Sequence, residues 1–141
     1  MIGETNLRQL LSSMAPRLLE DEYVFCTVTN GSYGDYKELS PLASYREVEG
    51  LTLLITRRQA DKHGIRYASI FKGITLTVHS GLDAVGLTAA VATTLAERGI
   101  SANVIAAYHH DHIFVPQDRA NDALDALNEE ANAEMQKILA E

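Results

Sequence analysis

One segment of the chain, residues 74–116, constrains the fold more than any other. It reads ITLTVHSGLDAVGLTAAVATTLAERGISANVIAAYHHDHIFVP. The pattern predicts a strand, a glycine-bearing turn, a helix ended by Gly99, and two further strands joined by a tight turn. Ile74, Leu76 and Val78 alternate with polar residues, which is typical of a strand with one buried face. The segment therefore predicts a helix packed on a sheet.

The helix of this segment is expected from about Asp83 to Arg98, with Asp83 in its first turn. Its apolar face is expected to consist of Val85, Thr88, Ala89, Ala92, Leu95 and Ala96. Gly86, Ala90 and Thr93 form a separate stripe of small residues. Small side chains allow another backbone to come close, so the stripe favours a second packing partner and predicts a homodimer.

The remaining elements are predicted from periodicity and from stop signals. Leu7–Met14 has helical spacing and ends before Pro16. Thr56 and Gln59 form a capping box at the start of a short helix that ends near Gly64. Three more strands are predicted over residues 23–29, 51–55 and 66–71, and a long last helix is expected to be capped by Asp118.

The order of these elements is αββαβ followed by βαββα. Each half lacks one strand of a ferredoxin-like βαββαβ unit. We therefore predict an α+β fold of two side-by-side ferredoxin-like lobes, with antiparallel sheets and helices packed on one face. The lobes are expected over residues 1–72 and 73–141, the second with the long terminal helix, and Gly73 lies where a strand would bend from one lobe into the other.

Composition excludes several classes of partner. The 141 residues have a net charge of −7 and no cluster of lysine or arginine, which argues against nucleic acid and anionic membranes. No apolar run reaches the roughly 20 residues of a membrane-spanning helix. The opening MIGETNLRQLLSSM does not resemble a secretory leader. Cys26 has no partner for an internal disulfide, so a cytoplasmic location is expected.

Residues 71–116, FKGITLTVHSGLDAVGLTAAVATTLAERGISANVIAAYHHDHIFVP, resemble an ACT domain. The chain is similar to small bacterial proteins built from two ACT-like halves, and more distantly to the ACT lobes of aspartate kinases and of the cytosolic arginine sensor. The similarity is close over residues 51–127 and extends to YVFCTV at 23–28. It implies a regulatory module that binds an amino acid and needs no cofactor, and it implies no enzyme activity.

By position, the resemblance places the ligand against the turn between the first strand and the helix, opposite the next strand. The residues it implies are His79, Ser80, Gly81, Leu82, Asp83, Val85, Gly86, Asn103, Val104 and Ile105. A helix start offers free N–H groups to a ligand carboxylate, and Gly81 and Gly86 let the backbone come close. Asp83 would then pair with an ammonium group. The same residues also fit a purely structural turn in which Asp83 only neutralises the helix dipole.

His109, His110, Asp111 and His112 are potential metal ligands, since imidazole and carboxylate both bind transition metals. Neighbours in an extended chain point to opposite sides, and no second ligand cluster lies elsewhere in the sequence. No metal site is therefore predicted, and this segment is expected to be a polar hairpin tip.

Three functional hypotheses follow. The first is a non-catalytic regulatory module that binds an amino acid or similar metabolite at Gly81–Gly86. The second is an interaction subunit that binds only a partner protein. The third is a small enzyme that uses the hairpin His109–His112 as its acid or base.

Overall fold

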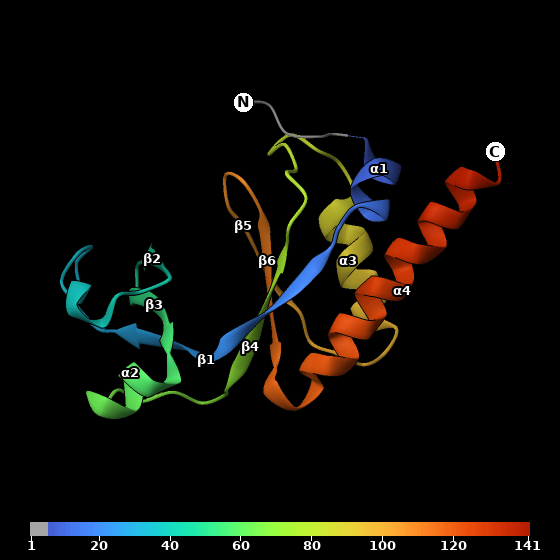
Figure 1. The fold of residues 1–141 in the computed structure, drawn as a ribbon. Coiled ribbons are helices and arrows are strands. Elements are labelled where there is room, and N and C mark those ends of the chain that lie inside the picture. The colour runs from blue at the N-terminus through green and yellow to red at the C-terminus, as the bar shows by residue number, and fades with distance from the viewer. Residues whose placement is uncertain (1–5) are drawn as a thin grey trace. The chain divides into compact units, whose positions relative to one another are not determined.

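The computed structural model describes residues 6–141, which form two compact units (Figure 1). Unit 1 joins the chain up to Leu19 with Gly73–Glu141, and unit 2 is Glu20–Lys72. Residues 1–5 lie outside the described residues. They belong to the opening segment that is expected not to form a secretory leader. The compact units are defined by contacts in the structure, whereas the predicted lobes 1–72 and 73–141 divide the chain by sequence. The division into lobes stays a prediction.

Each unit contains strands, α-helical structure and a 3-10 turn. Unit 1 contains α1 (Leu7–Ser12), the start of β1 (Pro16–Val28), most of β4 (Phe71–Leu76), α3 (Leu87–Ala96), β5 (Asn103–Ala106), β6 (Asp111–Pro116), the 3-10 turn η2 (Gln117–Arg119) and α4 (Ala120–Leu139). Unit 2 contains the rest of β1, the 3-10 turn η1 (Lys37–Leu39), β2 (Ala43–Glu47), β3 (Gly50–Thr56) and α2 (Arg57–Lys62).

The strands follow the hydrogen-bonded order β2-β3-β1-β4-β6-β5. The pairs β1–β3, β2–β3 and β5–β6 are antiparallel, with Asn103 of β5 opposite Phe114 of β6. In unit 1, β6 lies between β4 and β5, and α3 connects those two outer strands, as in a ferredoxin-like unit. Figure 1 shows α1, α3 and α4 together on one side of β4, β5 and β6. The predicted α+β fold with antiparallel strands and helices on one face is confirmed.

The helix α1 belongs to unit 1 because its apolar side chains complete the core there. Its start is capped by Asn6, whose side chain accepts a hydrogen bond from the Gln9 backbone N–H at 3.2 Å. Leu10 is fully buried in contact with the α3 and α4 core. The chain then turns beside the end of β4, where the Thr77 N–H donates to the Met14 carbonyl at 2.9 Å.

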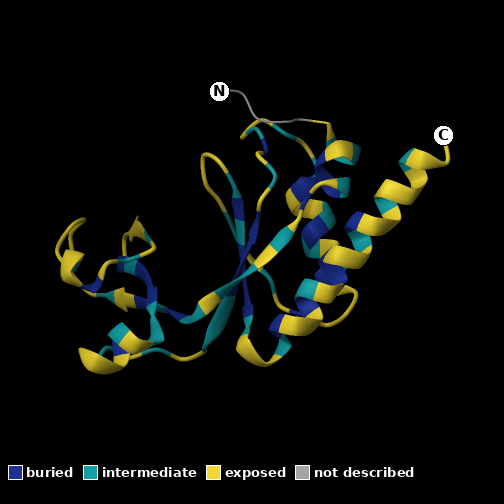
Figure 2. Ribbon diagram, in the orientation of Figure 1, coloured by how far each residue is buried: buried dark blue, intermediate teal, exposed yellow. Residues whose placement is uncertain are grey.

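Each unit has its own hydrophobic core (Figure 2). In unit 1 the buried residues include Leu10, Leu11, Met14, Ile74, Leu76, Leu87, Val91, Leu95, Ile100, Ile113, Val115, Ala123, Ala126 and Leu127. In unit 2 they are Val24, Cys26, Leu39, Leu51, Leu53, Ile55 and Ala60. Burial of this apolar area is the main stabilising contribution in both units.

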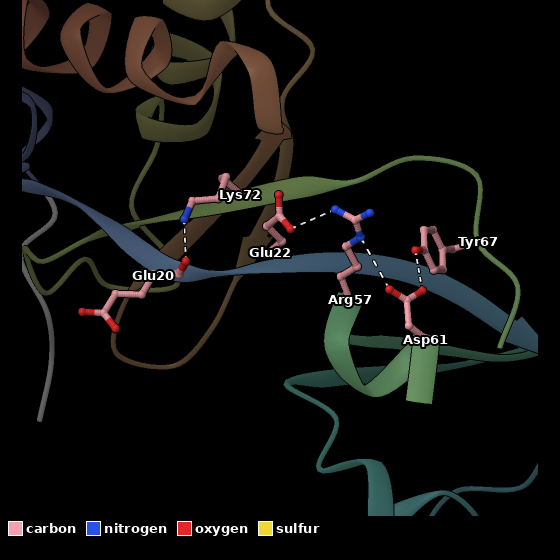
Figure 3. A network of polar contacts seen from close by, with 6 residues as sticks. All are labelled: Glu20, Glu22, Arg57, Asp61, Tyr67 and Lys72. Carbon is pink, nitrogen blue, oxygen red and sulfur yellow. Dashed lines mark hydrogen bonds and ion pairs between the residues drawn. The ribbon is translucent and has the colours of Figure 1, made fainter. Parts of the chain in front are cut away.

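In unit 2, α2 is tied to its surroundings by a polar network (Figure 3). Thr56 caps the helix as predicted, accepting from the Gln59 N–H at 3.2 Å. Arg57 pairs with Glu22 at 3.1 Å and with Asp61 at 3.6 Å. The Tyr67 hydroxyl donates to Asp61 at 2.7 Å. Because these side chains are partly exposed, water screens the ion pairs and each contributes little to stability.

The predicted helix start at Asp83 is wrong, because α3 begins at Leu87. The Ala84 N–H donates to the Gly81 carbonyl at 2.9 Å, which makes this stretch a turn. Gly86 is the N-cap, with φ of 102°, a left-handed conformation that favours glycine. The buried residues of α3 are Leu87, Val91 and Leu95, so the predicted apolar face, which included exposed Thr88, Ala89 and Ala96, was misplaced.

Three other expectations were also wrong. Residues 66–70 form no strand, and the backbone becomes extended only at Phe71. The strand β2 was missed because residues 44–47 are all exposed and so show no apolar alternation. Asp118 does not cap α4, because η2 precedes the helix and Arg119 occupies the N-cap position without a capping side-chain bond.

None of the helices within residues 6–141 combines the length and the apolarity that crossing a bilayer requires.

His112 connects β6 to β4 through a contact of 2.9 Å between its Nδ1 atom and the Thr75 hydroxyl. Burial lowers the pKa of His112, and the neighbouring His110 lowers it further, while Asp111 opposes both effects. The folded protein therefore resists protonation of this imidazole more than the unfolded chain does. Its contribution to stability is present above the ordinary histidine pKa of about 6.5 and is lost as the pH falls below that value.

We predict that replacing Leu10 with alanine lowers the free energy of unfolding by about 2–5 kcal/mol, because it opens a cavity beneath α1. Urea denaturation provides the measurement. Leu139→Ala is the matched control, since Leu139 lies 77% exposed on α4 and should change stability by less than about 0.5 kcal/mol. Equal effects of the two substitutions would show that α1 is not part of the core.

We predict that His112→Asn reduces the loss of stability between about pH 7.5 and pH 5.5. Asparagine can still bond to Thr75 but does not titrate, so the variant lacks the protonation that disfavours the folded state at low pH. Urea denaturation at both pH values measures the change. An identical pH dependence in wild type and variant would contradict the lowered pKa.

Candidate functional site

The candidate site lies in unit 1, at the turn between β4 and α3. Ser80 is buried there and is only 8% exposed. Its hydroxyl donates to Oδ2 of Asp111 at 2.9 Å. Asp111 is the first residue of β6 and is also only 8% exposed. Two polar side chains that are far apart in sequence are thus buried against each other.

A cavity of about 120 Å³ opens beside this pair. Its lining residues are Ser80, Gly81, Leu82, Ala84, Gly86, Leu87, Thr88, Ala106 and Asp111. The wall combines a glycine-bearing turn, the first two residues of α3 and one buried carboxylate. The first N–H groups of α3 have no partners within the helix and can accept a ligand anion.

The structure brings four of the predicted ligand-binding residues to this cavity and leaves six outside its lining. Ser80, Gly81, Leu82 and Gly86 line it. His79, Asp83, Val85, Asn103, Val104 and Ile105 do not. Asp83 and Val85 are exposed, and Asn103 is also exposed on β5, where its Nδ2 atom donates to the Phe114 carbonyl at 3.2 Å. Whether those six residues contact a ligand stays a prediction.

Five lining residues were not among the predicted site residues: Ala84, Leu87, Thr88, Ala106 and Asp111. Ala106 and Asp111 face each other as the last pair of the β5–β6 ladder, so the strand register places them together. The sequence does contain one signal for Asp111, because it is the only acidic residue in the segment from Ser101 to Gln117. Its place among three histidines predicts a polar hairpin tip instead of a ligand site.

Histidines crowd the outside of this end of unit 1. The ring centres of His79 and His110 are 4.8 Å apart, and those of His79 and His109 are 5.7 Å apart. His79 and His109 are exposed, while His110 and His112 are half-buried. Within residues 6–141, no three histidine, cysteine, aspartate or glutamate side chains are arranged to hold a metal ion.

Unit 2 has two larger hollows, of about 540 and 330 Å³. They share Tyr33 and Ser44 in their walls, and Tyr33 is 77% exposed. Neither hollow contains a buried charged side chain among its lining residues. They are therefore weaker candidates than the cavity at Ser80 and Asp111.

Cys26 in unit 2 is not suited to nucleophilic chemistry. Burial raises the pKa of its thiol, although a backbone hydrogen bond at Leu53 partly opposes this effect. The thiolate, which is the reactive form, is consequently disfavoured.

Family comparisons fit this architecture. One ACT domain model matches residues 2–72, and a second ACT domain model matches residues 71–129. No curated protein shows significant similarity to the chain. ACT domains are regulatory rather than catalytic and generally bind small molecules such as amino acids.

Three solved structures show the same fold. A Vibrio cholerae protein of unknown function, described as a possible transport protein, is 56% identical, with a TM-score of 0.81 over 89% of this chain and 95% of that one. An Agrobacterium tumefaciens protein is 14% identical, with a TM-score of 0.68 over 82% and 87% of the chains. The ligand-free regulatory subunit of Thermus thermophilus aspartate kinase is 8% identical, with a TM-score of 0.57 over 82% and 95%.

The two tandem matches together span residues 2–129, and the strand order of unit 1 is that of a ferredoxin-like lobe. The chain belongs to the ACT domain family.

Proposed function

We propose that this protein is a non-catalytic regulatory module that binds a small amino acid or a similar metabolite at the turn between β4 and α3. The observation that carries the proposal is the cavity of about 120 Å³ at that turn, with the buried Ser80–Asp111 pair in its wall. The ACT family supports a regulatory role that depends on a small molecule.

The proposed ligand fits the chemistry of the cavity wall. Gly81 and Gly86 present backbone without side chains, and Leu87 and Thr88 contribute the first N–H groups of α3. A carboxylate bound there would interact favourably with the positive end of the helix. Asp111 supplies the opposite charge nearby. Asp83, the residue first predicted to pair with an amino group, is exposed and outside the lining.

The roles described for two similar proteins agree in part with a regulatory assignment. The Thermus thermophilus neighbour is a regulatory subunit, although its low identity supports only the shared fold. The Vibrio cholerae relative is described as a possible transport protein, and a module that binds a small metabolite is compatible with either context. We propose a cytoplasmic location from the single cysteine and the acidic composition.

We also propose a homodimer, although part of the small-residue stripe on α3 is covered by the same chain. A side chain at Gly86 would lie 3.0 Å from Leu7, so α1 of the same chain already occupies the space next to that glycine. Ala90 packs partly against the core of unit 1, which leaves Thr93 as the exposed member of the predicted stripe.

The interaction-subunit hypothesis has one observation in its favour. The strand β2 lies at the end of the strand order. Tyr45 on this strand is 72% exposed, and Val48, which follows the strand, is fully exposed. An edge strand of this kind can pair with another chain. The enzyme hypothesis, with an acid or base from the hairpin His109–His112, is less well supported. Asp111 of that hairpin lines the cavity at the β4–α3 turn, but none of the three cavities described above is lined by His109, His110 or His112.

We predict that at least one of the twenty amino acids raises the thermal unfolding temperature. A ligand at about 100 times its Kd adds roughly 2.7 kcal/mol to the free energy of unfolding. Ala106→Phe should abolish this increase, because the new ring occupies the cavity. Ala107→Phe is the matched control, since Ala107 is exposed and outside the lining.

A flat response to the whole panel would favour the interaction subunit. An increase that persists in Ala106→Phe would place the binding site elsewhere in the chain.

A further inference from the structure

Asp111 is a buried carboxylate with few partners. It is 8% exposed, and its carboxylate accepts a hydrogen bond from the Ser80 hydroxyl at 2.9 Å. Among the ion pairs of residues 6–141, none involves Asp111. A buried charge without a counter-ion is costly, so most buried carboxylates are paired with a cation.

His112, which follows Asp111 in β6, does not supply that cation at neutral pH. His112 is directed to Thr75 on β4, and burial lowers the pKa of its ring, which keeps it neutral. His110 precedes Asp111, and its ring contacts His79 and His112. Within β6, neighbouring residues point to opposite faces, so His112 lies on the face opposite Asp111.

The free side of Asp111 borders the cavity at the β4–α3 turn. A cationic group in that cavity would therefore meet a negative charge that lacks a counter-ion. A primary ammonium has three N–H donors, so it can bond to the carboxylate and still reach the Ser80 oxygen. Charge-assisted hydrogen bonds of this kind are about twice as strong as neutral ones.

We infer that Asp111, held in place by Ser80, binds the ammonium group of the ligand and selects small ligands that carry one. The inference rests on the proposed function and adds the group that recognises the amine. It replaces Asp83 in that role.

Cavity size narrows the ligand class further. Pockets for drug-sized molecules measure about 300–1,000 Å³, and this cavity measures about 120 Å³. Leu82, Ala84 and Leu87 give its wall an apolar part. The chemistry favours an α-amino acid with a short side chain, its carboxylate at the start of α3 and its ammonium at Asp111.

The test is isothermal titration calorimetry at neutral pH with glycine, L-alanine and L-serine as probes. N-acetylglycine and propionate are the negative probes, since each keeps a carboxylate but lacks an ammonium. Wild type should bind at least one of the three amino acids and neither negative probe. Asp111→Asn should weaken that binding roughly 10- to 100-fold, the range expected for losing a charge-assisted hydrogen bond.

Three further variants sharpen the result. Ser80→Ala should weaken binding by a smaller factor, because the carboxylate remains but loses its positioning donor. Asp83→Asn tests the competing assignment and should change the Kd less than about threefold. Asp118→Asn, at an exposed aspartate of η2, is the matched control for loss of an acidic residue.

Urea denaturation of the ligand-free variants shows whether a loss of binding is caused by misfolding. Removing an uncompensated buried charge should leave the urea midpoint of Asp111→Asn equal to or above that of wild type. A large decrease would show that Asp111 is structural and would overturn the inference.

The results of these titrations distinguish the role of Asp111 from the proposed function itself. Binding of an amino acid that survives Asp111→Asn, or that is lost in Asp83→Asn, would overturn the role of Asp111 but retain the proposed function. Binding of propionate as tightly as of alanine would overturn the requirement for an ammonium. No binding of any amino acid by wild type would overturn the proposed function itself.

Discussion

The left-handed backbone of Gly86 determines where α3 begins, and the candidate site depends on that position. With φ of 102°, Gly86 ends the turn and starts the helix at Leu87. A residue with a side chain would be strained there and would also meet Leu7 of α1 at 3.0 Å. The helix start therefore stands apart from Ser80, and the intervening space becomes the cavity. One glycine thus links the packing of α1 to the shape of the binding site.

Local signals in the sequence predicted most of the elements. The capping box at Thr56 and the apolar spacing of Leu7–Met14 each marked a helix that the structure contains. These signals failed in segments whose backbone conformation depends on solvent exposure or on tertiary contacts. The strand β2 has exposed side chains from Ser44 onwards and is held by backbone pairing with β3. The turn before α3 contains two good helix formers, Leu82 and Ala84, but the left-handed conformation of Gly86 and its closeness to α1 place the helix start at Leu87.

The candidate site was predictable in position but not in chemistry. Its turn follows from a strand, a glycine and a helix in order, and Ser80, Gly81, Leu82 and Gly86 do line the cavity. Asp111 was not predictable as a partner of Ser80, because the two are 31 residues apart and Ser80 follows β4, which becomes the neighbour of β6 only in the folded sheet. Because Asp111 is buried with Ser80, its negative charge needs a counter-ion. This need is the basis of the proposed selectivity for amines.

The central claim is that a small amino acid binds at the β4–α3 turn. Two-dimensional ¹⁵N–¹H NMR spectra recorded during titrations with glycine, L-alanine and L-serine test it most directly. The account predicts saturable shifts in the amide signals of Ser80–Thr88, Ala106 and Asp111, the backbone that surrounds the cavity. Spectra that stay unchanged with all three amino acids, or shifts confined to the Tyr33–Arg46 region of unit 2, would contradict it.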